Sequence, residues 1–201
     1  MEGRICYLAI ILIAFIHASG AQPATAQYTD LGTNPLSLIF GSLKVTGEHP
    51  VGPSGSIEWQ AAYLLPSNRF WTASYKSRGV RVGLSYLLYF DATGEHEGLY
   101  AFAYTRLGRI DYRDDDTVFV NFRDVDLRQN RWSVGVGLGY KRFVNDHLFL
   151  GAALGGGRAI YDDYRITTPG ANGDEDTLGP ILEQAFAVYG RIAFGYRFAK
   201  R

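Results

Sequence analysis

The sequence predicts an all-β fold, an antiparallel up-and-down transmembrane β-barrel of eight strands that follows a cleaved signal peptide. Bulky apolar residues alternate with small or polar ones in segment after segment, and this period of two is typical of strands. The composition agrees, because 24 glycines, 14 tyrosines and 12 phenylalanines accompany a single methionine among the 201 residues. After the N-terminal segment, no apolar run approaches the roughly 20 residues that a spanning helix needs.

The N-terminal segment is typical of a secretory signal peptide. Arg4 precedes an apolar run over residues 5–16, which is too short to span a bilayer as a helix. Ala24-Thr25-Ala26 offers a cleavage site before Gln27, and residues 18–20 offer a second one. We therefore divide the chain into a signal peptide over 1–26 and a single barrel domain over 27–201. The only cysteine lies in the removed segment, so we expect no disulfide or cysteine metal site.

The alternation is strict over 185–198, and it is also clear over 132–141, where bulky residues alternate with Gly135, Gly137 and Gly139. Large residues outside and small ones inside suit a narrow barrel. Six strands are predicted on this basis, over 56–65, 80–90, 99–110, 132–141, 148–161 and 185–198. In the segment 99–110 both phases carry apolar side chains, so the sequence leaves its inward face open.

The region before residue 50 breaks the alternation. Leu36, Leu38 and Phe40 share one phase, whereas Leu43 and Val45 share the other. Residues 34–49 therefore form either one long strand with a bulge or two strands with a turn at Gly41-Ser42. The later connections are alternately short and long, as in outer-membrane barrels, whose short turns face the periplasm and whose long loops face outward. An even strand number then requires a strand over 34–40, which makes eight.

Several polar side chains share the inward phase of their strands. Because side chains just fill an eight-stranded barrel, charges inside it must pair to offset desolvation. We expect a salt-bridge network rather than a transport path, with an arginine beside the one acid of the set. The predicted lumen network consists of Glu58, Gln60, Arg81, Ser85, Lys141, Arg191 and Arg197.

No catalytic, cofactor or metal site is predicted. His49, His96 and His147 fall in the short turns, and no Gly-x-Ser-x-Gly motif is present. The glycines of 135–139 lie inside a strand and not in a dinucleotide-binding loop. The acidic clusters at 114–116 and 174–176 lack the ligand spacing of a calcium loop. The formal net charge of zero gives no basis for nucleic-acid binding.

Together, the signal peptide, the segment 34–41, the aromatic and glycine-rich strands and the closing Gly-Tyr-Arg-Phe at 195–198 resemble small bacterial outer-membrane barrels of the opacity and porin-like class. Many members of these families have no assigned activity. The resemblance implies a location in the outer membrane of a Gram-negative envelope, in contact with its lipid. It also implies that the barrel-assembly machinery reads the closing aromatic residues, here Tyr196 and Phe198.

Two functional hypotheses follow. The first is a non-enzymatic outer-membrane barrel with an envelope-structural role, or with a surface-interaction role in which the long loops 113–130 and 162–184 bind an extracellular partner. The alternative is a soluble secreted or periplasmic barrel of the lipocalin type that binds a small apolar ligand. A lipocalin-like barrel would turn Val80, Leu84 and Val136 inward, whereas a membrane barrel would turn them toward lipid.

Overall fold

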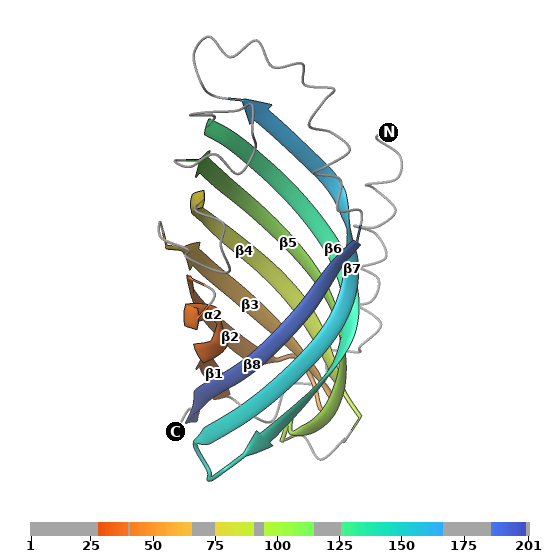
Figure 1. The fold of residues 1–201 in the computed structure, drawn as a ribbon. Coiled ribbons are helices and arrows are strands. Elements are labelled where there is room, and N and C mark those ends of the chain that lie inside the picture. Colours follow the sequence, from red (N-terminus) through yellow and green to blue (C-terminus); the bar gives the residue numbers. More distant parts are fainter. Residues whose placement is uncertain are drawn as a thin grey trace.

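The protein is a closed antiparallel barrel of eight strands in sequential order, as the computed structural model shows (Figure 1). The structure describes residues 28–39, 41–65, 75–90, 95–114, 126–166 and 186–199. It confirms the predicted fold class, while the predicted signal peptide lies outside the described residues. The elements are β1 (Tyr28–Thr33), α2 (Pro35–Ile39), β2 (Ser42–Pro50), β3 (Gly55–Leu64), β4 (Tyr75–Tyr89), β5 (Gly98–Asp114), β6 (Asp126–Phe143), β7 (Leu148–Ile166) and β8 (Phe186–Ala199).

The expected strand over 34–40 is wrong, because residues 35–39 form the short helix α2. The first strand is β1, which lies before this segment. Pro35 occupies the first helical position, where its missing N–H costs no hydrogen bond. Gly41 follows with a φ of 66°, and its N–H donates to the Leu38 carbonyl at 3.0 Å. The break in alternation near Gly41 is therefore the turn between β1 and β2.

The wall closes between β1 and β8, but over only part of β8. The register runs from Tyr28 opposite Ala199 to Thr33 opposite Phe194. β8 continues to Phe186 and pairs there with β7 on its other side. Among the described strand pairs, residues 186–193 have no partner on the β1 side. We call residues 186–193, beside which α2 takes the place of a strand, the seam.

The strands β5, β6 and β7 are longer than predicted, with 17, 18 and 19 residues. Most of their extra residues fall at the ends predicted as the long loops 113–130 and 162–184, so residues 113–114, 126–130 and 162–166 are strand instead. These ends carry paired charges, such as Arg128 Nε with Asp111 Oδ1 at 2.8 Å. Apolar alternation stops where the charges begin, although backbone pairing continues. The rest of both loops lies outside the described residues.

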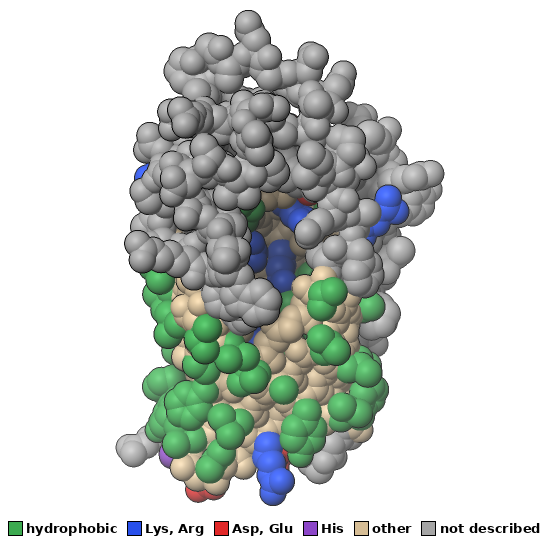
Figure 2. Space-filling model, in the orientation of Figure 1, with side chains coloured by type: hydrophobic (Ala, Val, Ile, Leu, Met, Phe, Trp, Pro, Cys, Tyr) green, Lys and Arg blue, Asp and Glu red, His purple; other side chains and the backbone are tan. Residues whose placement is uncertain are grey.

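The outer wall is apolar over the lower part of the barrel (Figure 2). Val80, Leu84 and Val136 have exposed fractions of 53%, 54% and 65%. In the segment whose facing the sequence left open, Tyr100, Phe102 and Tyr104 are buried and therefore point inward. Within the described ranges, none of the helical segments has the length and apolar character needed to cross a bilayer.

Interior glycines of β6 make room for the aromatic rings of β5. Gly135, Gly137 and Gly139 lie opposite Tyr104, Phe102 and Tyr100, respectively. A Cβ atom on any of the three would overlap the ring of its partner. The glycine alternation predicted for a narrow barrel is thus a packing requirement of the lumen.

We expect Gly137→Ala to lower the free energy of unfolding by about 1–3 kcal/mol, as overpacking of a filled interior does. The new Cβ would meet the Phe102 ring and lie 2.7 Å from the Gly155 Cα. Gly190→Ala is the matched control, because a Cβ there has no atom within 4 Å. Urea titration of the barrel folded in phospholipid vesicles measures both. Equal effects of the two substitutions would contradict this account of the glycines.

Candidate functional site

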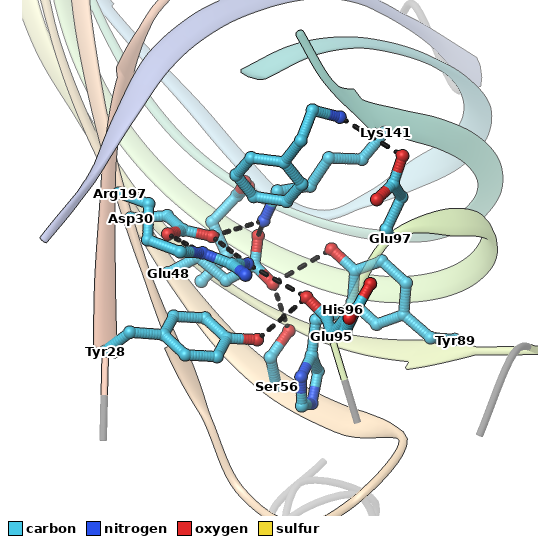
Figure 3. Close-up of polar contacts among 12 residues, drawn as sticks. Tyr28, Asp30, Glu48, Ser56, Tyr89, Glu95, His96, Glu97, Lys141 and Arg197 are labelled. Atoms are coloured by element: carbon cyan, nitrogen blue, oxygen red, sulfur yellow. Dashed lines mark hydrogen bonds and ion pairs between the residues drawn. The ribbon is translucent and has the colours of Figure 1, made fainter. Parts of the chain in front are cut away.

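Buried ion pairs fill the short-turn end of the lumen (Figure 3). Lys141 Nζ donates to Asp30 Oδ2 at 2.6 Å and to Glu48 Oε2 at 2.7 Å. Arg197 donates two hydrogen bonds to the same Asp30, from Nε at 2.8 Å and from a terminal nitrogen at 3.0 Å. We call Asp30, Glu48, Lys141 and Arg197 the basal network. It joins β1, β2, β6 and β8.

The second oxygen of Glu48 is also satisfied. Glu48 Oε1 accepts hydrogen bonds from Ser56 Oγ at 2.7 Å and from Tyr89 Oη at 2.9 Å. Buried charges are costly unless they are paired and hydrogen-bonded. Here both carboxylates face a cation, so the network meets that requirement.

Glu95 and His96, which precede β5, lie under the basal network. The His96 ring is buried and contacts the rings of Tyr28 and Tyr89 edge-on, at centroid distances of 5.7 and 5.2 Å. His96 Nε2 lies 3.0 Å from the Gly55 carbonyl oxygen. A terminal Arg197 nitrogen donates to the Glu95 carbonyl at 3.0 Å. Of the three turn histidines, His96 is thus part of the interior.

Above the basal network, Arg191 forms an ion pair with Glu58 and donates to Tyr100 Oη at 2.9 Å. Arg191 is therefore the arginine expected beside Glu58. Five rings form a layer here, with centroids 5.1–6.1 Å apart, from Tyr89, Tyr100, Phe102, Tyr104 and Tyr189. The cavity between this pair and the basal network is about 10 Å³. It has room for about one water molecule.

The long-loop end of the lumen is hollow. A pocket of about 470 Å³ lies there, and Lys44, Arg81 and Arg106 are among the residues that line it. Lys44 comes from β2, Arg81 from β4 and Arg106 from β5. Gln60 of β3 and Asn34 after β1 also line it. We call this space the cationic pocket.

The residues predicted to form one lumen network fall into separate groups. Lys141 and Arg197 belong to the basal network, and Glu58 pairs with Arg191. Gln60 and Arg81 line the cationic pocket. Ser85 is buried and lies opposite Glu58 in the register of β3 and β4.

Sequence reasoning missed several interior charges, among them Asp30, Lys44, Glu48 and Arg106. A usable signal existed for two of them, because Lys44 and Glu48 alternate with Leu43 and Val45 in one strand. Asp30 lies in a strand that the apolar pattern did not reveal. Arg106 shares the inward phase of Tyr100, Phe102 and Tyr104, whose facing the sequence left open.

Tyr196 and Phe198 face outward on β8, with ring centroids 4.8 Å apart. The His147 ring stacks on Tyr196 at 5.2 Å, so both aromatic residues lie at the short-turn end of the wall. In the part of the chain that the structure describes, no group of three or more His, Cys, Asp or Glu side chains could hold a metal ion.

We expect Lys141→Met to lower the free energy of unfolding by about 3–5 kcal/mol, because it leaves Glu48 buried without its cation. Arg165→Met is the control. It breaks the pair with Asp163 at 3.0 Å, but the Arg165 side chain is 70% exposed. The control should lower the free energy of unfolding by less than about 1 kcal/mol. Denaturant unfolding in vesicles measures both, and a Lys141 variant as stable as the control would refute the importance of the pairing.

Two solved structures are similar to the chain. At 15% identity, the chain is similar to a major outer membrane protein from Thermus thermophilus, with a TM-score of 0.52 over 87% of this chain and 100% of that one. The N-terminal β-barrel domain of Pseudomonas aeruginosa OprF also matches, at 11% identity and a TM-score of 0.47, over 86% of this chain and 98% of that one. The first likeness shows that the fold is that of an outer-membrane barrel.

No curated protein matches the chain. One family model matches residues 7–183, which is most of the chain, and its description is "Protein of unknown function (DUF3575)". The chain therefore belongs to the DUF3575 family and has the eight-stranded fold of outer-membrane barrels.

Proposed function

We propose that this protein is a non-enzymatic barrel of the Gram-negative outer membrane, with an envelope-structural role and with long loops that can contact an extracellular partner. The observation that carries the proposal is an apolar outer wall around a lumen whose lower part is filled by buried ion pairs. An interior of this kind in an apolar shell is stable where lipid surrounds the wall. The proposal includes export through the signal peptide over 1–26.

The facing of the bulky residues supports this proposal over a lipocalin-like barrel. Val80, Leu84 and Val136 lie on the outside, whereas Arg191 and Lys141 are buried inside. A soluble barrel that binds an apolar ligand needs the reverse arrangement. The small cavity in the lower lumen has Asp30, Glu48 and Lys141 in its lining, which does not suit an apolar ligand.

The packing of the lower lumen supports a structural rather than a conducting role. Lys141 and Arg191 both line the cavity of about 10 Å³, and each forms an ion pair with an acid from another strand. A solute that passed through would have to separate these pairs in a low-dielectric interior, which is costly.

The long strands support the surface role. β5, β6 and β7 are joined by backbone pairing as far as the charged residues near Asp114, Asp126 and Ile166. A rigid scaffold of this kind positions the connections that follow it, here residues 115–125 and 167–185. These connections are the segments that we assign to partner contact.

The histidines give no support to an enzymatic role. His96 packs against Tyr28 and Tyr89, and His147 stacks on Tyr196. His49 is exposed, and its Nδ1 lies 3.4 Å from Thr29 Oγ1. All three lie at the short-turn end, which we assign to the periplasm.

We also propose that Tyr196 and Phe198 carry the barrel-assembly signal, since both are exposed at the C-terminal end of the last strand. Phe198→Ala should then reduce the amount of barrel in the outer membrane of cells, while refolding of the purified variant into vesicles stays near wild type. Quantitative blotting of membrane fractions and a refolding assay measure the two. Equal losses in both assays would instead indicate that Phe198 stabilises the folded barrel and is not read as an assembly signal.

The membrane location is tested with two equally exposed valines. Val136 on the wall and Val144 in a short turn are both 65% exposed. In lipid, Val136→Arg should lower the free energy of unfolding by about 2–4 kcal/mol, whereas Val144→Arg near the interface should lower it by about 0–1 kcal/mol. Outer-membrane fractionation and heat-modified gel mobility measure both variants. If both are tolerated equally, or if the wild type fractionates as soluble protein, the proposal fails.

The structural role predicts that the wild-type barrel shows no discrete conductance steps in planar lipid bilayers. The buried pairs of Lys141 and Arg191 fill the bore. Current recordings on the purified protein at several voltages measure this, with a known porin as the positive control. Regular ohmic steps from the purified wild type would overturn the structural role.

A further inference from the structure

The cationic pocket reaches the outer wall through the seam. Its lining includes interior cations together with Leu36 of α2 and Val188 and Ile192 of β8. These three apolar side chains are exposed on the outside, Val188 at 75%. Gly190 between them adds no side chain, and a Cβ there would have no atom within 4 Å. Figure 2 shows a hollow in this face, with Lys and Arg side chains inside it. The pocket therefore opens sideways.

The charges of the pocket are unbalanced. Among the residues that the structure describes, no carboxylate forms an ion pair with Lys44, Arg81 or Arg106. Arg191 also lines the pocket, but Glu58 compensates its charge. The basal network, by contrast, pairs every cation. Three cations around one pocket, without an ion-pair partner among the described carboxylates, are unfavourable unless an anion joins them.

Two of the three guanidinium nitrogens of Arg106 are held in place without a hydrogen-bond partner in the part of the chain that the structure describes. The Arg106 guanidinium lies 3.9 Å from the Tyr189 ring centroid and 4.5 Å from the Tyr104 centroid. These rings orient the group, yet its Nε and one terminal nitrogen are buried without a hydrogen-bond partner. Gln60 Nε2 is also buried without a hydrogen-bond partner among the described residues. Buried donors are normally satisfied, so this set is typical of a site built for an acceptor-rich ligand.

The backbone brings these donors together. Gln60, Gly83 and Arg106 lie side by side in the register of β3, β4 and β5. A Cβ on Gly83 would come within 2.6 Å of Gln60 Nε2 and 2.9 Å of Arg106 Cγ. The glycine thus lets both side chains occupy the lumen at one level. Lys44 and Arg81 lie in the neighbouring row, on either side of Ala62.

We propose that the cationic pocket binds a phosphate group through Lys44, Arg81 and Arg106. A phosphate monoester offers several acceptor oxygens and close to two negative charges, which match forked guanidinium donors. The apolar seam beside the cations accommodates the tail of an amphiphile, so the phosphate can belong to a lipid head group or to a soluble phosphate compound. Both sources present the same chemistry to the pocket.

The test uses the full chain folded in zwitterionic detergent and titrated with sodium pyrophosphate in a calorimeter. Arg106→Gln and Lys44→Gln should each weaken binding by about tenfold or more, as expected for loss of a charge-assisted contact. Arg109→Gln is the matched control, because Arg109 is an exposed arginine on the same strand. Its effect should stay within about twofold. An equal loss in the control would mean nonspecific charge attraction and would overturn the proposal.

A second arm separates the two sources of phosphate. The protein is reconstituted in phosphatidylcholine vesicles with or without phosphatidic acid, and its thermal unfolding is compared. A rise in the midpoint with phosphatidic acid that Arg106→Gln abolishes indicates a lipid ligand. Pyrophosphate binding without this rise indicates a soluble one. If the folded wild type responds to neither probe, the proposal is wrong.

A purely structural role for Arg106 is tested by stability without ligand. Arg106→Gln removes a cation that has no acid partner in the described residues, so it should leave the unfolding midpoint unchanged or raise it. Arg191→Gln breaks the pair with Glu58 and should lower it. Equal destabilisation by both variants would show that Arg106 serves the fold and would contradict a ligand site.

Discussion

The closure of this barrel depends on Asp30. The strand β1 has only six residues, and it is the strand that joins the two ends of the sheet. The Asp30 carboxylate forms ion pairs with Lys141 of β6 and Arg197 of β8. One buried acid therefore connects the first strand to the last strand and to the opposite wall. A short strand has few backbone hydrogen bonds of its own. The ion pairs therefore supply the stability that the length of β1 does not.

The strands with a regular apolar stripe were predictable from the sequence, because lipid-facing and lumen-facing residues must alternate. β1 was not predictable, since Leu31 is its only large apolar residue that faces outward. Leu36, Leu38 and Phe40, by contrast, have the spacing of a strand, although residues 35–39 are helical. The outer ends of β5 to β7 were missed for a related reason. Backbone pairing does not need apolar side chains, so a strand can continue where the pattern ends.

The inward phase also indicated several interior charges, among them Glu58 and Arg191. Which charges meet could not be read from the sequence, because these two residues are 133 positions apart and meet across the bore. The separation of the ion-paired lower lumen from the cationic pocket above it has the same origin. It depends on the heights at which Asp30, Glu48 and Glu58 enter the barrel, and only the register of the strands determines those heights.

The seam beside β8 has a consequence for how the barrel sits in a bilayer. Among the described strand pairs, the backbone of residues 186–193 is bonded to β7 on one side only. Unpaired peptide groups are not tolerated against hydrocarbon, where no water can satisfy them. With no strand partner among the described residues, the seam fits best next to polar head groups, where water can reach its peptide groups while its apolar side chains face the upper edge of the hydrocarbon. The depth of insertion would follow from where the first strand stops, as well as from the height of the apolar belt.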